Sequence, residues 1–412
     1  MKYWWVWLIY LVVVWLRFFN SFQTEGNLRR LVDKPIKLEG KISSEPILQG
    51  SSQKFKMGRI EVRVKQYPRY EYGQNVQVFG SLQRKVVNRW YSRFSLMYPN
   101  IEVVKADRVK FIGLDWKEGL MSLRRRVEKV FNQSLPEPEA SLLAGIVLGA
   151  KRGLPYEFWQ ALQRTGTLHI VVASGYNVTV VIGVVIGYLA GWVKRRIAVM
   201  LGILAVMGYT VMAGAEAAIV RAAIMGSLAY FGQVLGRKAD GVRLLIVAVM
   251  GMVVVEPRLI WDVGFQLSVM ATSGLMFVGP VLNRVFKRVW LIGGDMRDTV
   301  AAQIGVWPIL LITFGNLSVF AVVVNSLILW LVPVVMGLGG ILAVGGLIWQ
   351  PLGQVIGWLA YVPLALMVRV IEWFGDKAWM SWQVEGISWW WGLGYYLVLA
   401  GLLFRNRYGK QK

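Results

Sequence analysis

Residues Arg164–Val180 read RTGTLHIVVASGYNVTV and lead into an apolar run that ends near Trp192. The run is long enough to cross a membrane, because a spanning helix needs about 20 apolar residues. It also contains three residues that a lipid-facing helix does not need, Ser174, Gly175 and Asn177. Glycine is a poor helix former, so Gly175 predicts a local break. Polar groups at membrane depth must face protein or water, and this stretch therefore predicts one wall of a hydrated passage.

The composition of the 412 residues is that of a polytopic membrane protein. Hydrophobic residues make up 56% of the chain, and 20 of its residues are tryptophan. A formal net charge of +23 is unusual for so apolar a chain, and it indicates cytoplasmic loops, contact with anionic lipid, or a polyanionic cargo. The chain has no cysteine, which excludes disulfides, thiolate catalysis and a Cys-ligated metal site.

The first 139 residues divide into an anchor and a charged region. No small-residue cleavage site follows the apolar run Tyr3–Phe19, so residues 1–19 are predicted to be an uncleaved transmembrane anchor. Residues 20–139 carry ten more Lys and Arg than Asp and Glu, and they contain no run of membrane length. This region is therefore predicted to lie outside the bilayer and to attract polyanions.

Residues 20–113 are predicted to form a small β-barrel of the OB type, because short alternating strands this close together suit a closed barrel. Residues 114–139 are predicted to be an amphipathic connecting helix, whose run Arg124–Arg126 is expected to contact lipid headgroups rather than nucleic acid. Apolar and polar residues alternate in Ile36–Ile42, Arg59–Lys65, Asn75–Gly80 and Ile101–Ile112.

Such barrels bind single strands by combining a basic groove with aromatic residues that stack on bases. The alternative is a solvated barrel face whose aromatic residues belong to the core, and periodicity alone does not separate the two. The candidate DNA-binding residues are Lys65, Tyr67, Arg69, Tyr70, Arg84, Lys85, Arg89, Trp90, Tyr91 and Arg93.

Residues 140–405 are predicted to be a helical channel domain. Glu139–Ala150 is too short to span a bilayer, so it is expected to be re-entrant, interfacial or packed within the bundle. Val319–Ile348 is long for one helix, and Pro333 with the glycines that follow it predicts a kink or a dip. With the anchor, the apolar runs give about ten spans. They are Leu168–Val193, Ile197–Ala213, Ala217–Leu235, Val242–Val255, Leu259–Leu282, Thr299–Phe314, Val319–Ile348, Leu352–Phe374 and Ser388–Phe404.

Basic residues predict the orientation. Lys194–Arg196, Arg237–Arg243, Arg284–Arg288 and the basic tail 406–412 fall on one side under this count. By the positive-inside rule that side is cytoplasmic, so both termini are predicted to be cytoplasmic and residues 20–139 extracytoplasmic. The chain is then a multi-pass protein of a bacterial inner membrane, and its cationic outer domain favours an anionic partner that arrives from outside.

Two kinds of enzyme are disfavoured. His169 and Ser174 lie five residues apart, about 140° around a regular helix, whereas a catalytic dyad needs hydrogen-bond distance. A catalytic zinc normally takes three protein ligands, and His169 is the only histidine of a chain without cysteine. We therefore predict no catalytic residue, no metal and no cofactor.

Polar residues in the later apolar runs favour a passage. A charge at membrane depth is costly unless it is paired or meets water. Each residue alone is explained by an interhelical hydrogen bond, but together they predict a hydrated route. The residues predicted to line or gate it are His169, Ser174, Gly175, Asn177, Glu216, Arg221, Asp262, Gln266 and Ser268. An ion-pair set of Glu216, Arg221 and Asp262 is the alternative that the sequence leaves open.

These motifs resemble the competence domain of the ComEC family, the inner-membrane DNA-uptake channels of naturally transformable bacteria. Leu142–Pro155 is similar to the family's short Leu-rich helix and turn, and Arg164–Gly175 to its R-x-T/S-G-x-x-H-x-x-x-x-S-G motif. Further matches in the family's order are Gly214–Arg221, Gly236–Asp240, Glu256–Pro257 and Asp262–Ser268, and Tyr72–Gly80 is similar to the OB-like outer domain.

The resemblance implies a channel or translocase that imports single-stranded DNA, with Arg221 and the basic barrel on phosphates. It implies contact with the lipid membrane and partners of three kinds: a DNA receptor, a separate nuclease and a helicase-type ATPase. A homo-oligomer is compatible with it. Many members carry a second histidine where this chain has Asn177. Larger members add a metallo-β-lactamase-like domain, which this chain is expected to lack because His169 is its only histidine. The alternatives from other classes are a secondary transporter, a lipid-handling protein and a membrane scaffold.

Overall fold

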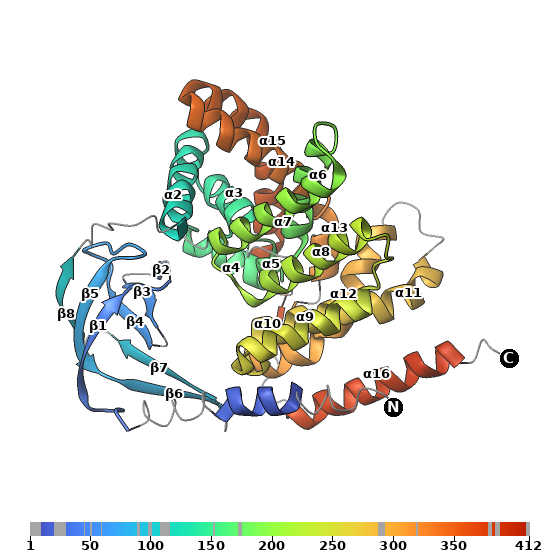
Figure 1. The fold of residues 1–412 in the computed structure, drawn as a ribbon, viewed down its shortest axis with the longest axis horizontal. Coiled ribbons are helices and arrows are strands. Elements are labelled where there is room, and N and C mark those ends of the chain that lie inside the picture. The colour runs from blue at the N-terminus through green and yellow to red at the C-terminus, as the bar shows by residue number, and fades with distance from the viewer. Residues whose placement is uncertain are drawn as a thin grey trace.

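The computed structural model consists of a β-sheet domain beside a helical bundle (Figure 1). The chain enters through an apolar helix, Tyr10–Phe19, then builds the sheet domain and finally the bundle. The residues that the structure describes are 10–19, 30–44, 46–49, 52–58, 60–88, 91–97, 101–107, 116–150, 153–171, 175–286, 293–318, 320–377, 381–383 and 388–408.

The sheet domain holds eight strands in two sheets. One sheet has the order β1-β5-β8, and the other has the order β2-β3-β4-β7-β6, in which β4 and β7 run parallel. All four alternating segments that the sequence singled out contain strands, namely β1, β4, β5 and β8. The strands are β1 (Pro35–Lys41), β2 (Ile47–Gln49), β3 (Ser52–Met57), β4 (Ile60–Lys65), β5 (Asn75–Ser81), β6 (Gln83–Asn88), β7 (Tyr91–Met97) and β8 (Ile101–Asp107).

The predicted closed barrel is not formed by these strands. β5 pairs with β1 on one edge and with β8 on the other, and β4 pairs with β3 and β7. Both edges of each of these central strands are therefore paired within its own sheet. The two sheets instead enclose a shared apolar core, because alternate residues of β3, β4 and β5 point inward. Phe55, Val62 and Val78 are almost fully buried there.

The connecting helix and the short helix after it meet inside the bundle. α2 (Trp116–Ser134) agrees with the predicted helix, and it packs on α3 (Glu139–Leu148), α14 and α15. Nine of the ten residues of α3 are buried, so the alternative of packing within the bundle is the one confirmed. α3 ends where Gly149 takes a left-handed φ of 66°, which a glycine adopts without a steric penalty.

The remaining helices follow the predicted apolar runs. They are α4 (Tyr156–Arg164), α5 (Leu168–Val171), α6 (Gly175–Leu189), α7 (Arg195–Met212), α8 (Ala217–Val234), α9 (Gly241–Val255), the 3-10 turn η1 (Pro257–Trp261), α10 (Val263–Ser273), the π-helical turn η2 (Gly274–Val278), α11 (Gly279–Phe286), α12 (Gly293–Phe314), α13 (Ala321–Ile328), α14 (Leu331–Ile348), α15 (Gln350–Gly375) and α16 (Trp389–Tyr408). Between them, β9 (Asn316–Ser318) pairs with β10 (Ser381–Gln383).

Six described helical segments are long and apolar enough to cross a membrane, so the predicted count of ten is not confirmed. The described part of the first apolar run, Tyr10–Phe19, and α9, with 15 residues, are short for a bilayer that needs about 20. α12 opens with charged residues that lower its apolar character. The six are Leu168–Leu189, Arg195–Met212, Ala217–Val234, Val263–Asn283, Leu331–Ile348 and Gln350–Gly375.

The long run Val319–Ile348 contains two helices, and the break lies before Pro333, while Pro333 and the glycines expected to kink the chain lie within α14. The chain turns at Leu329 and Trp330 between α13 and α14. Gly346 of α14 serves packing, since a Cβ on Gly353 of α15 would lie 2.8 Å from the Cα of Gly346. Small residues let helix backbones approach this closely, which is how helices associate in membranes.

Side chains of α16 bond α12 next to Pro308, a proline inside that helix. Pro308 has no N–H, so the carbonyl of Ile304 lacks its helical donor. The Tyr395 hydroxyl donates to that oxygen over 3.0 Å, and the Tyr396 hydroxyl donates to Gly305 O over 2.8 Å. These two bonds dock α16 on α12.

Two of the four basic segments used for the orientation meet at one end of the bundle. Arg195 at the start of α7 donates to Gln233 near the end of α8, which brings the basic segments 194–196 and 237–243 to one end. At the other end of α7, the carbonyl of Met212 accepts from the Arg124 Nη1 of α2 over 2.6 Å. Arg124 is therefore buried and caps a helix, contrary to the predicted contact with lipid headgroups, and the sheet domain joins the bundle at the end away from those basic loops.

We expect Tyr395→Phe to lower the stability of the protein by about 0.5–2 kcal/mol, because it removes the donor to the orphaned Ile304 carbonyl. Thermal unfolding of the purified chain in lipid nanodiscs measures the effect. Tyr188→Phe on the exposed face of α6 is the matched control and should leave the transition within about 0.5 kcal/mol. Equal shifts for both variants would remove the proposed docking role.

Candidate functional site

Three of the residues predicted to line the passage come together between α6, α8 and α10. The Arg221 Nε donates to Ser268 Oγ over 2.8 Å. The Nη1 atom lies 3.3 Å from the sulfur of Met225, one turn along α8. The remaining edge faces α6, since a Cβ on Gly175 would lie 3.5 Å from Arg221 Nη2. The glycine thus leaves the space that the guanidinium occupies.

The charge of Arg221 has no acidic partner among the residues that the structure describes. The side chain is only 8% exposed, and its printed partners are a hydroxyl and a thioether. The alternative of an ion-pair set with Glu216 and Asp262 is therefore not what these helices form. A buried cation without a counter-ion costs several kcal/mol unless water or an anion reaches it. This arrangement suits a site that receives a negative group.

Asn177 has a different part in the structure. Its Nδ2 donates over 2.7 Å to Ile146 O, one of the last carbonyls of α3, and the side chain is 1% exposed. The C-terminal carbonyls of a helix need partners from outside it, and a short helix inside a bundle cannot use water for this purpose. Asn177 therefore fixes α6 to the end of α3.

Asp262 and Gln266 hold the start of α10. The Asp262 carboxylate accepts from the backbone N–H of Phe265 over 2.8 Å, three residues on, as an N-cap does. The Gln266 amide donates to Ile260 O in η1 over 2.7 Å. Glu216 occupies the N-cap position of α8 with no side-chain capping bond. Asp262 and Gln266, which were predicted to line the passage, thus bond the start of α10.

The segment around His169 is only partly described. The His169 ring is exposed on α5, and its Nδ1 lies 3.0 Å from Gly166 O. Thr165 and Thr167 are fully buried, and their hydroxyls lie 2.8 Å apart. Ser174 lies outside the described residues, and Gly175, where a helix break was predicted, is the first residue of α6.

Among the candidate DNA-binding residues of the sheet domain, one is buried and others are exposed. Tyr70 is 7% exposed and packs on Phe55 with ring centroids 5.7 Å apart, so it belongs to the core and is not available to stack on a base. The same burial raises the pKa of the Tyr70 phenol. Lys65 and Tyr67 are exposed, and the Arg69 guanidinium lies 5.7 Å from the centre of the Tyr67 ring.

The other candidates of the sheet domain are less fully placed. Arg84 and Lys85 lie on β6, Tyr91 and Arg93 on β7, and the structure describes their backbone. Arg89 and Trp90 lie outside the described residues.

A cavity where the sheet domain meets the bundle was not foreseen. It is lined by Arg69 and Tyr70 from one side and by residues of α2 and α3, such as Asn132, from the other. Nothing in the local sequence marks Asn132, because its place depends on how two distant parts of the chain pack. Among the described residues there is no group of three His, Asp or Glu that could hold a metal ion.

Comparison with known proteins gives a family and one curated relative. The model of the family described as "Competence protein" matches residues 146–408. The chain is 24% identical over 214 residues to "ComE operon protein 3" of Bacillus subtilis (strain 168). That match covers 52% of this chain and 27% of the relative, so the chain spans about a quarter of the relative's length. No solved structure matches this chain.

We expect Asn177→Ala to destabilise the protein by about 1–3 kcal/mol, because the variant leaves a buried helix carbonyl without a donor. Thermal unfolding in nanodiscs measures the loss. Thr179→Ala, on the exposed face of the same helix, should change stability by no more than about 0.5 kcal/mol. A stable Asn177→Ala protein would show that the bond to Ile146 O does not secure α3.

Proposed function

Because the chain belongs to the competence protein family, we propose that it forms a membrane channel or translocase that passes single-stranded DNA inward. The observation that carries the proposal is Arg221, a buried arginine inside the membrane-length helix α8 with no acidic partner among the described residues. A phosphodiester is a single negative charge with acceptor oxygens, which a guanidinium binds well. DNA is the polyanion that a competence role supplies.

In this proposal the route runs between α6, α8 and α10. Arg221 contacts phosphates, Gly175 leaves room beside it, and Ser268 holds the guanidinium in place. His169, Ser174 and Glu216 border the route, while Asn177, Asp262 and Gln266 position its walls through helix-end bonds. Contacts of this kind read charge and not base identity, so import is independent of sequence.

The sheet domain supplies the outer, DNA-gathering part of the proposal. Its exposed Lys65, Tyr67 and Arg69 combine positive charge with an aromatic face, which is the combination that binds single strands. β6 and β7, which carry further candidates, belong to the same sheet as β4, the strand that ends at Lys65. The basic loops share the end of the bundle away from this domain, and the positive-inside rule puts that end in the cytoplasm.

The proposal also includes partners. Since no phosphate-binding loop is evident in the sequence, the energy for movement comes from a partner ATPase or from capture of the strand in the cytoplasm. A DNA receptor and a separate nuclease would deliver one strand. The rival is a transporter of another anionic cargo, because a buried arginine also suits a small anion.

We expect Arg221→Gln to reduce import of labelled DNA at least tenfold, which is about 1.4 kcal/mol of lost interaction, while the amount of inserted protein stays normal. Arg221→Lys keeps the charge but loses the fork of donors, so it should recover part of the import. Transformation of cells that carry each variant measures both.

Arg243→Gln is the control, because that side chain lies in the first turn of α9 and is 85% exposed. It should leave import unchanged. Full import by Arg221→Gln with normal insertion would reject the channel proposal. Loss of uptake of a small anion instead of DNA would favour the transporter.

A further inference from the structure

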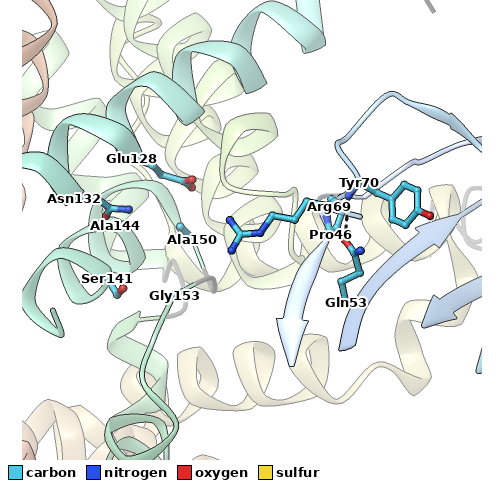
Figure 2. A pocket seen from close by; sticks show the side chains of 10 residues that line it. All are labelled: Pro46, Gln53, Arg69, Tyr70, Glu128, Asn132, Ser141, Ala144, Ala150 and Gly153. Carbon is cyan, nitrogen blue, oxygen red and sulfur yellow. Dashed lines mark hydrogen bonds between the residues drawn. The ribbon is translucent and has the colours of Figure 1, made fainter. Parts of the chain in front are cut away.

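A cavity of about 300 Å³ lies at the junction of the sheet domain and the bundle (Figure 2). Figure 2 shows the Arg69 side chain reaching from the sheet domain toward the space in front of α2 and the end of α3. The sheet domain contributes Pro46, Gln53, Arg69 and Tyr70, and the bundle contributes Glu128, Asn132, Ser141, Ala144, Ala150 and Gly153.

Arg69 is held on a rigid support. Gln53 is 1% exposed, and its Nε2 donates to the carbonyls of Lys65 and Gln66 over 2.8 and 3.2 Å. Its Oε1 accepts from the backbone N–H of Tyr70 over 3.1 Å. One buried amide therefore ties together the backbone of the loop that carries Arg69, and the guanidinium rests near the Tyr67 ring.

The positive charge of Arg69 is available to a ligand. The carboxylate in the cavity wall, Glu128, already forms a salt bridge of 3.1 Å with Arg124 of α2. Within the described ranges no carboxylate forms a salt bridge with Arg69, whose printed contact is the ring of Tyr67. Glu137, behind the wall, is bound by Ser141. A negative group entering the cavity would thus meet an unneutralised guanidinium.

The opposite wall offers an amide and open space. Asn132 is exposed on α2, and an amide can both donate and accept hydrogen bonds. Ala144 and Ala150 leave room because their side chains are small. A charged point and an amide on facing walls match a ligand that carries an anionic group and a polar ring edge.

We propose that this cavity binds one nucleotide of a single strand, with its phosphate on Arg69 and its base edge on Asn132, where the strand passes from the sheet domain into the bundle. The inference rests on the proposed function and adds a selectivity step to it. Binding pockets for small molecules are roughly 300–1,000 Å³, so this one admits a nucleotide and no more. A paired base has already used its Watson–Crick edge, so only an unpaired base can offer that edge to the amide.

The absence of cysteine makes a direct test simple. The full chain in lipid nanodiscs carries a single thiol, at Asn132→Cys in the cavity wall or at Gln133→Cys, the next residue of α2, which does not line it. Reaction with a fluorescent maleimide is timed with and without oligo-dT. At about ten times its measured Kd, oligo-dT should slow labelling of the Asn132→Cys protein roughly tenfold by mass action. It should not change labelling of the Gln133→Cys protein, and a duplex of the same length should protect neither.

Each other outcome overturns the inference. If oligo-dT binds, as fluorescence anisotropy reports, but both thiols react at unchanged rates, the cavity is not the site while the proposed function stands. Equal protection by duplex removes the selectivity step. Absence of any oligo-dT binding at low salt overturns this inference and the role of the sheet domain in the proposed function together.

The salt dependence of oligo-dT binding provides a second test. Each phosphate neutralised on a single strand contributes about −0.7 to the slope of log K against log salt concentration. Arg69→Gln should therefore make the slope shallower by about 0.7, whereas Arg126→Gln, an exposed arginine of α2 outside the cavity, should not change it. An unchanged slope for Arg69→Gln would show that this side chain does not contact a phosphate.

Discussion

The bundle depends on one constraint, that no backbone group at membrane depth is left without a partner. Helix ends and kinks inside the bundle break the helical hydrogen-bond pattern, and specific side chains repair it. Asn177 bonds the end of α3, Arg124 bonds the end of α7, and Asp262 caps the start of α10. Tyr395 bonds the carbonyl that Pro308 leaves free. These polar side chains bond backbone groups that lack a helical partner. In this way a short helix such as α3 can be buried in the bundle.

Against this background Arg221 stands apart. It bonds no backbone group among the described residues and closes no helix end. Its partners are the side chains of Ser268 and Met225, and one edge of the guanidinium faces Gly175. A structural polar residue satisfies another group of the protein, whereas Arg221 keeps a charge that the described part of the protein does not neutralise. That contrast separates the residue proposed to bind cargo from the residues that position the helices around it.

The sequence predicted what depends on local pattern. Period-two segments became strands, and α2 and α3 formed where expected, whereas the break in Val319–Ile348 lies before the predicted site at Pro333. The sequence did not predict features that depend on contacts between distant parts of the chain. Tyr70 was a candidate to contact DNA but packs on Phe55, and the strands pair as two sheets because edge pairing is a property of the whole domain. The partners of Arg124 and Arg221 are equally non-local, since Met212 and Ser268 lie 88 and 47 residues away along the chain. The sequence shows that polar residues lie within the apolar runs. Which group each of them bonds depends on how the helices pack.

Movement of a polyanion needs sites that hold it weakly enough to release it, and the two proposed phosphate contacts meet this requirement in different ways. Arg69 is exposed to solvent, so water and salt weaken its attraction for a phosphate. Arg221 is buried, where attraction is stronger, but an arginine has five N–H donors and its Nε and Nη1 are already engaged. Three donors, one on Nη1 and two on Nη2, remain for a phosphate, which is fewer than a free guanidinium offers. A strand can therefore pass from a screened site to a partly occupied one without being trapped at either.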